Sequence, residues 1–245
     1  MIGVLGGSGL TALLEPVDVV AVDTPFGPPS ASVTISTVGD RRVAFLPRHG
    51  AGHRIAPHRV NYRANLWALR EVGVTGVLAP FAAGSLSPVI DPGDLVVVDQ
   101  LVDRTRGRAD TYFDDFADGP HHASFADPYD PDLRAGLLEA AAEGPLKVHD
   151  HGTVVVIQGP RFSTRAESVW FASQGWSVVN MTQYPEAVLA RELDLPYAGI
   201  ALITDRDTGT EDGSVAPVSQ EEVFAAFEHN LEHLRGVLLR VAAAA

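Results

Sequence analysis

A series of short apolar runs rich in β-branched residues recurs along this 245-residue chain and constrains its fold more than any other feature. Most of the runs are continuous rather than alternating, which is typical of strands buried on both faces. We expect strands at residues 2–6, 17–22, 31–37, 42–47, 75–84, 95–102, 153–159, 177–182 and 197–205.

Helical patterns separate the later runs, and two of them end on glycine, which is a helix-stop signal. In the last one, Ser219 followed three residues later by Glu222 matches a capping box. The sequence therefore predicts one α/β domain over residues 1–245, with a central mixed β-sheet flanked by helices and a parallel core. We expect helices at residues 57–73, 165–175, 184–195 and 219–241.

The balance of charges and the absence of cysteine exclude several classes of function. The chain has 31 Asp and Glu against 18 Lys and Arg, a net charge of −13. Nucleic-acid binding depends on basic surface, so no nucleic-acid partner is expected, and an anionic ligand must be held by a local cluster of donors. With no cysteine, disulfides, thiolate catalysis and Cys-zinc sites are excluded.

The apolar runs are too short for a membrane segment, because none reaches about 18 residues. The chain starts on a strand without a basic and apolar signal segment, so we expect a cytoplasmic protein that does not bind membranes. The long polar stretch at residues 104–131 has the length of a functional loop.

The opening glycine loop allows several interpretations. Residues 7–12, GSGLTA, fit the G-x-G-x-x-A dinucleotide pattern, but Pro16 stops the following helix after about five residues. Because the full βαβ unit is missing, dinucleotide binding is disfavoured. A turn without a ligand remains open, and so does a turn whose backbone N–H groups and Ser8 hydroxyl hold one phosphate or carboxylate.

Residues 45–65 form the densest polar cluster, and Arg48 and His49 stand at the end of an apolar strand, where α/β sheets place ligands. The forked guanidinium matches phosphate oxygens. Three histidines, His49, His53 and His58, suggest a metal site. Their spacing is not that of a zinc-binding helix, so no metal is expected. Three nearby arginines are interpreted as solvated or ion-paired: Arg54, Arg59 and Arg63.

Two later strand ends carry aromatic or polar residues. Phe162 follows the strand at 153–159, either as a core residue or as a shelf for a planar base. Asn180, Met181 and Thr182 end the next strand, where Met181 is well placed to line a pocket.

Asp205 and Asp207 end the strand at residues 197–205. Carboxylates two residues apart on a strand point the same way, and their mutual repulsion raises one pKa, which makes a candidate proton donor. Two solvated loop acids are the alternative. A calcium loop is excluded, because Gly209 and Ala216 occupy ligand positions.

Motifs in a fixed order across nearly the whole chain resemble those of the trimeric purine nucleoside phosphorylases, in the methylthioadenosine phosphorylase branch. They are GGSGL, FLPRHG, the stretch from His53 to Leu69, AAGSL, PGDLVVVDQLVDRT, FADPY, GPRFSTRAES, the NMT and PEAVLARE pair, and TDRD. The resemblance implies that phosphate attacks the anomeric carbon of a purine nucleoside and releases the base and a ribose 1-phosphate. It implies no metal or organic cofactor, inorganic phosphate as co-substrate, and a homotrimer.

The resemblance also implies a role for each matching residue. The phosphate contacts are Ser8, Arg48, His49, Thr182 and the backbone of Ala82. On the nucleoside side, Met181 lies under the ribose and Phe162 packs on the base. Asp205, with Asp207 beside it, bonds N7 and the 6-substituent, which favours adenine-type bases. His122, in the long loop, matches a histidine that reaches a neighbouring subunit's pocket near the 5′ end of the sugar.

One departure from the family pattern concerns phosphate binding. Where the family usually has two threonines, this chain has Pro80 and Phe81 before Ala82. Phe81 cannot donate, and a lost hydrogen bond to a charged group costs about 1.5–3 kcal/mol. Gln158 replaces a frequent Glu.

Alternatives to a methylthioadenosine or adenosine phosphorylase therefore stay open. The first is a phosphorylase for 6-oxopurine nucleosides such as inosine, or one of broad specificity. A nucleoside hydrolase or a non-catalytic nucleoside binder would follow if Phe81 disables the phosphate site.

Overall fold

The computed structural model describes residues 1–7, 10, 13–117, 119–208 and 218–244, and these contain one mixed sheet of 11 strands. The main path runs β2-β3-β4-β1-β5-β10-β9-β7, while β11 pairs with β5 and β6, and β8 pairs with β6. The strands are β1 (Ile2–Gly6), β2 (Asp18–Val20), β3 (Val33–Val38), β4 (Arg41–Pro47), β5 (Gly76–Ser85), β6 (Leu95–Val97), β7 (Gln100–Arg104), β8 (Val148–His149), β9 (Thr153–Ile157), β10 (Val178–Asn180) and β11 (Tyr197–Arg206).

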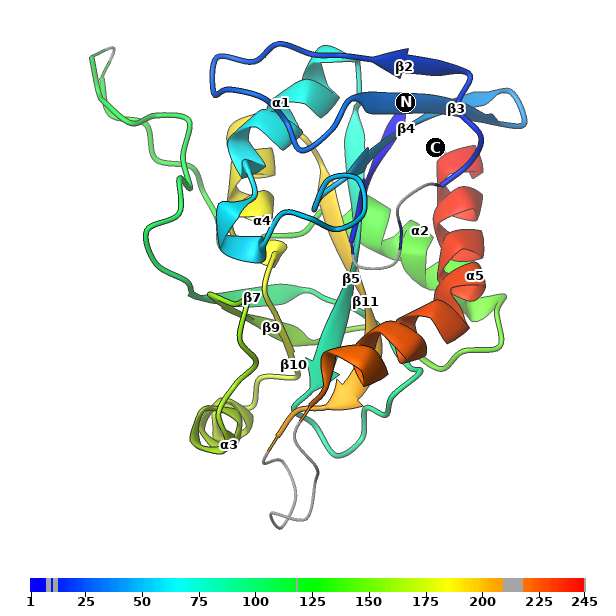
Figure 1. The fold of residues 1–245 in the computed structure, drawn as a ribbon, viewed down its shortest axis with the longest axis vertical. Coiled ribbons are helices and arrows are strands. Elements are labelled where there is room, and N and C mark those ends of the chain that lie inside the picture. Colours follow the sequence, from blue (N-terminus) through cyan, green and yellow to red (C-terminus); the bar gives the residue numbers. More distant parts are fainter. Residues whose placement is uncertain (8–9, 11–12, 118, 209–217, 245) are drawn as a thin grey trace.

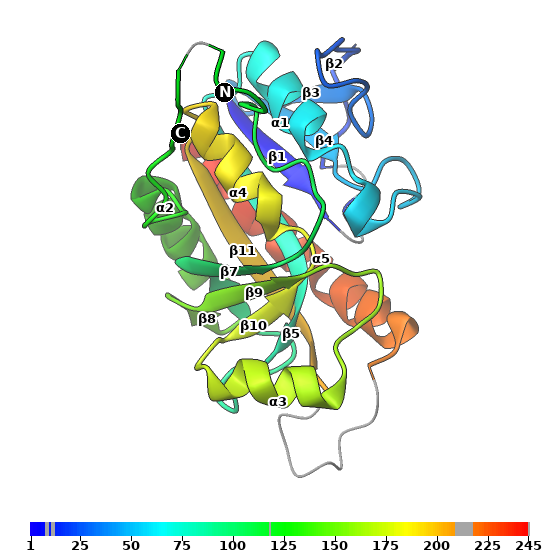
Figure 2. The same ribbon diagram turned by 90° about the vertical axis from the view of Figure 1, so that its left-hand side faces the viewer.

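Helices cover both faces of this sheet, as the sequence predicts (Figure 1). Helices α1 and α4 lie on one face and α2 and α5 on the other, and Figure 2 shows α3 beside β9 and β10. Each face has its own buried apolar cluster. The helices are α1 (Tyr62–Glu71), α2 (Pro131–Ala142), α3 (Arg165–Ser173), α4 (Gln183–Glu192) and α5 (Gln220–Ala244).

The structure differs from the expected elements in four places, one of which is the short strand β8, outside every expected strand. The run at 95–102 is two strands, because Asp99 turns the chain and accepts a hydrogen bond from the Gly152 N–H at 2.9 Å. The helix expected at 57–73 is a 3₁₀ turn, Pro57–Arg59, followed by α1, which Asn61 caps. Helix α2 was not expected, although Asp130 caps it by accepting from the Leu133 N–H at 2.9 Å.

A gap in the strand pairing of β5 creates the space for a site. On one edge, β1 pairs with residues 76–78 of β5, and β10 pairs with residues 84 and 85. Between them, residues 79–83 have no strand partner on this edge among the described pairings. Strands β1 and β4 run parallel to β5 and β10 runs antiparallel, so the carboxyl ends of all three converge on the gap.

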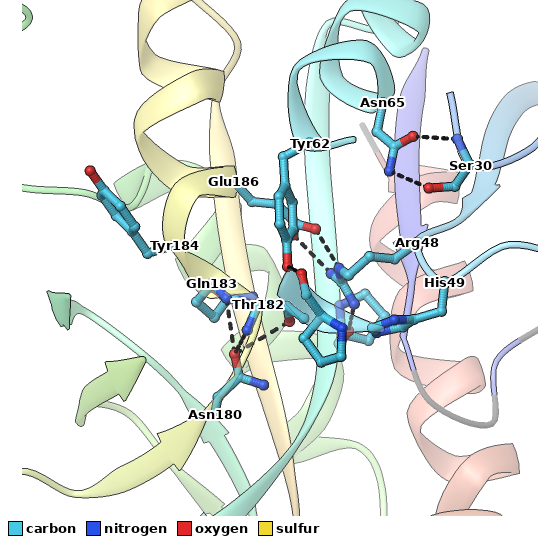
Figure 3. A network of polar contacts seen from close by, with 12 residues as sticks. Ser30, Arg48, His49, Tyr62, Asn65, Asn180, Thr182, Gln183, Tyr184 and Glu186 are labelled. Atoms are coloured by element: carbon cyan, nitrogen blue, oxygen red, sulfur yellow. Dashed lines mark hydrogen bonds and ion pairs between the residues drawn. The ribbon is translucent and has the colours of Figure 1, made fainter. Parts of the chain in front are cut away.

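A buried ion pair spans this gap (Figure 3). Arg48 follows β4, and Glu186 lies on α4, which follows β10. The Arg48 Nε donates to Glu186 Oε1, and Nη2 donates to Oε2 at 2.9 Å. The side chains are 1% and 0% exposed, and the Tyr197 hydroxyl also donates to Oε2 at 2.9 Å. Burial by itself lowers the pKa of Arg48, but the charge and hydrogen bonds of Glu186 outweigh it and raise that pKa.

Replacing Glu186 by Ala is expected to destabilise the protein by about 3–5 kcal/mol, because it leaves Arg48 buried and unpaired. Replacing both partners, as in Arg48→Met with Glu186→Leu, should recover most of that loss, since no buried charge remains. Urea unfolding followed by circular dichroism measures both. Exposed Glu139 on α2 supplies the control, and Glu139→Ala should stay within about 0.5 kcal/mol of the wild type. A Glu186→Ala variant as stable as this control would contradict a structural role for the pair.

Candidate functional site

A pocket of about 380 Å³ opens at the gap in the sheet. The ends of strands and the loops after them form most of its wall, which explains how residues far apart in sequence meet there. The wall comes from Gly7, the loop at 48–57, residues 81–84 of β5, residues 160–163, residues 179–182, the end of β11 at 204–207, and the first turns of α5.

The described residues expected to contact phosphate all lie in this wall: Arg48, His49, Ala82 and Thr182. Ser8 lies outside the described residues. Its neighbour Gly7 approaches so closely that an added Cβ would lie 2.9 Å from both Arg48 Nη1 and the Pro80 carbonyl oxygen. The opening loop therefore needs glycine at position 7 to pass this close to Arg48 and β5.

Arg48 offers hydrogen-bond donors to the pocket but no net charge, because Glu186 neutralises it. Its Nη1 donates to the Pro80 carbonyl at 3.3 Å, and the side chain is fixed at Nε and Nη2 by Glu186. A guanidinium has five N–H groups, so further donors on Nη1 and Nη2 remain. The ion pair therefore orients Arg48 toward the gap.

His49 is neutral at physiological pH. Burial, followed by the charge of Arg48 and the neighbouring His53, lowers the pKa of His49 to about 3. Its Nδ1 lies 2.8 Å from the Ile55 carbonyl oxygen, which only accepts, so Nδ1 carries the proton and Nε2 is the acceptor. The rings of His49 and His53 stack with centroids 4.1 Å apart. Among the described residues, no group of three or more His, Asp or Glu side chains is arranged to hold a metal ion.

Asn180 fixes the strand end that carries Thr182 (Figure 3). Its Oδ1 accepts from the N–H groups of Thr182 at 2.6 Å and Gln183 at 2.9 Å. Its Nδ2 donates to the Ala82 carbonyl at 3.1 Å. One side chain thus ties the start of α4 to β5, and it sets the position of Thr182 relative to Ala82.

The residues expected to contact the nucleoside also line the pocket: Phe162, Met181, Asp205 and Asp207. The register between β11 and β5 shifts between Ile203 and Asp205, just before the two acids. An added Cβ on Gly84 would lie 2.9 Å from Asp205 Oδ2, so this glycine leaves room for the carboxylate. The prediction that both acids share one site is therefore consistent with the geometry.

Both carboxyl groups hold protons more tightly than usual. Burial raises the pKa of Asp205 to about 6, and the charge of Asp207 adds to the effect, while a hydrogen bond from Thr204 Oγ1 at 2.7 Å opposes it. Burial also raises the pKa of Asp207, against a hydrogen bond from Ser168 Oγ at 2.5 Å. A carboxyl that titrates near neutrality in a pocket can both accept and donate a proton, as functional sites often require.

The sequence singles out two further residues, His122 and Phe81, and only Phe81 borders the pocket of its own chain. His122 is exposed and lies outside the pocket wall of its own chain, with its ring edge-on to Phe116 at 5.6 Å, so its contact with a neighbouring subunit stays a prediction. Phe81 is 1% exposed and packs in the apolar cluster on the α1 and α4 face while also bordering the pocket. The Phe81 side chain therefore serves the core and offers no donor to an anion.

Sequence reasoning missed two parts of the site. Gln220, Val223 and Phe224 of α5 line the pocket, and their i, i+3, i+4 spacing was a readable sign of one helix face. Glu186 was also missed, because a lone acid in a helix gives no sign of burial or of a partner 138 residues away.

Comparisons with known proteins agree with this geometry. Residues 1–243 match the model of the phosphorylase superfamily. The S-methyl-5′-thioadenosine phosphorylase of Mycolicibacterium smegmatis is 61% identical, over 94% of this chain and 86% of that protein. The purine nucleoside phosphorylase of Streptomyces coelicolor is 56% identical, over 99% and 88%.

A solved structure shows the same fold. The methylthioadenosine phosphorylase of Schistosoma mansoni in complex with adenine superposes with a TM-score of 0.93 at 39% identity, covering 99% of this chain and 91% of the other. The pocket, the order of motifs and these similarities agree, and the chain belongs to the phosphorylase superfamily.

Proposed function

We propose that this protein is a purine nucleoside phosphorylase, which uses inorganic phosphate to cleave the N-glycosidic bond of a purine nucleoside. The observation that carries the proposal is that one pocket brings together the donors at Arg48 and Thr182 with the paired acids Asp205 and Asp207. Phe162 adds an aromatic ring for the base. The names of the similar proteins support the same activity.

The reaction assigns distinct tasks to the two groups of residues. A phosphate oxygen forms a bond to the anomeric carbon, and the bond from that carbon to the purine nitrogen breaks with its electron pair going to the base. Arg48 and Thr182 position the phosphate, and a proton or hydrogen bond from Asp205 to N7 stabilises the leaving base. The products are the free base and a pentose 1-phosphate, so no metal or organic cofactor is needed.

Asp205 favours a 6-amino purine such as that of methylthioadenosine or adenosine. In its ionised form the carboxylate accepts from the 6-amino group, and in its protonated form it donates to N7. With a pKa of about 6, both forms are accessible near neutral pH. The adenine held by the similar Schistosoma mansoni protein supports this choice.

A second candidate is a 6-oxopurine or broad-specificity phosphorylase. Pro80 and Phe81 occupy the segment where the family usually has threonines, and this segment borders the pocket. The 56% identity to a protein named only as a purine nucleoside phosphorylase supports this alternative.

A homotrimer is part of the proposal, because the long loop is fastened to its own chain on only part of its length. Glu192 accepts from Thr111 Oγ1 at 2.8 Å and from the Tyr112 N–H at 2.7 Å, while Arg191 donates to the Asp127 carbonyl at 2.6 Å. Between Asp114, which pairs with Arg63, and Ser124, whose carbonyl accepts from Arg191, the loop extends away from the sheet (Figure 1). The Phe116 side chain in this segment is exposed. An arm of this kind suits a neighbouring subunit, to which it would bring His122.

We place the enzyme in the cytoplasm. Within the part of the chain that the structure describes, no helix combines the length and the apolar character that crossing a membrane requires.

The direct test is release of base from methylthioadenosine, adenosine and inosine, each measured with and without phosphate. We expect phosphate-dependent cleavage, fastest on the 6-amino substrates. Cleavage of inosine alone would favour the second candidate. Base release that is indifferent to phosphate would indicate a hydrolase and contradict the proposal.

Asp205→Asn should lower kcat/KM for adenosine by about 10- to 100-fold more than for inosine, because the amide can donate to a 6-oxo group while the carboxylate is lost for a 6-amino group. Initial rates on both nucleosides give the ratio. The control is Asp132→Asn, which removes one negative charge at an exposed position on α2 and should leave both rates unchanged. Equal losses on the two nucleosides would contradict the role given to Asp205.

A further inference from the structure

The charges that line the pocket leave the expected phosphate without an obvious counter-ion. Arg48 is neutralised by Glu186, His49 is neutral, and Asp205 and Asp207 are acids. Phosphate carries one to two negative charges near neutral pH, in a chain with a net charge of −13. A further positive charge near the donors would therefore favour phosphate binding.

Arg54 supplies such a charge. It lines the pocket, and its side chain is exposed, so it lies at the mouth. Within the residues that the structure describes, no ion pair or hydrogen bond joins its guanidinium to an acid or a carbonyl. Among the described residues that line the pocket, the arginines are Arg48 and Arg54, and of these two only Arg54 keeps its charge available to a ligand.

The loop that carries Arg54 is closed tightly onto His49. The Ile55 N–H donates to the His49 carbonyl at 3.0 Å, and His49 Nδ1 donates to the Ile55 carbonyl at 2.8 Å. On the other side of Arg54, His53 stacks on His49 and has a φ of 55°. The backbone at position 54 is thus fixed on both sides beside a residue expected to contact phosphate.

We propose that Arg54 is a phosphate-binding residue at the pocket mouth, which recruits the incoming anion and holds it against Arg48 and His49. The inference rests on the proposed function, because it assumes that phosphate is the co-substrate. The forked guanidinium can donate two hydrogen bonds to one phosphate. Arg54 would therefore replace the donor that is lost where Phe81 stands.

The test compares Arg54→Gln with Arg59→Gln. Arg59 is also exposed, ends the 3₁₀ turn five residues later and lies outside the pocket wall, so both variants lose one positive charge in the same region. Initial rates are measured against phosphate concentration at constant ionic strength set with chloride. Arg54→Gln should raise the KM for phosphate about tenfold and leave kcat within about twofold, while Arg59→Gln leaves both unchanged. Arg54→Lys, which keeps the charge, should recover part of the loss.

A second measurement does not depend on turnover. Inorganic phosphate should raise the melting temperature of the wild type and of Arg59→Gln, and raise that of Arg54→Gln clearly less at the same concentration. Equal values for the two Gln variants in both measurements would overturn the role of Arg54. If the wild type releases base without need of phosphate, the proposed function is wrong. In that case the thermal shift alone decides whether Arg54 binds the anion.

Discussion

The buried ion pair between Arg48 and Glu186 is the interaction on which the site depends. Strand β5 leaves residues 79–83 unpaired on one edge among the described pairings, and the segments that border this gap belong to β1, β4 and β10. Arg48 follows β4 and Glu186 follows β10, so their two hydrogen bonds join the sides of the gap. Tyr197 adds a third bond from β11. The gap can stay open as a pocket because a charged pair, rather than strand pairing, holds its sides together.

The same pair also sets the chemistry of the pocket. Because Glu186 neutralises the charge of Arg48, Arg48 acts as an oriented hydrogen-bond donor. The positive charge that can attract an anion then lies at the pocket mouth, on Arg54. At the other strand ends, burial keeps His49 neutral and raises the pKa of Asp205 to about 6. One desolvated pocket thus keeps His49 uncharged and favours the proton on Asp205, and the second effect is the one that protonation of the leaving base needs.

The sequence predicts the sheet and the convergence of the site well, for a physical reason. Continuous β-branched runs indicate buried strands, and polar residues at or after their carboxyl ends meet at the gap in the sheet, as Arg48, Thr182 and Asp205 do. Details that depend on contacts distant in sequence could not be predicted. The run at 95–102 divides because Asp99 bonds Gly152, and Glu186 finds a partner on another strand. Ser8 lies outside the described residues. The contact predicted for His122 depends on how it meets a neighbouring subunit.

The most direct test of the whole account is a crystal structure of the protein with adenine and inorganic phosphate bound together. We predict phosphate at the gap in β5, in contact with Arg48, His49 and Thr182, with the Arg54 guanidinium turned toward it. We also expect the adenine ring on Phe162, with N7 and the 6-amino group facing Asp205. Phosphate bound away from Arg48, or adenine with its 6-amino group turned away from Asp205, would contradict the account.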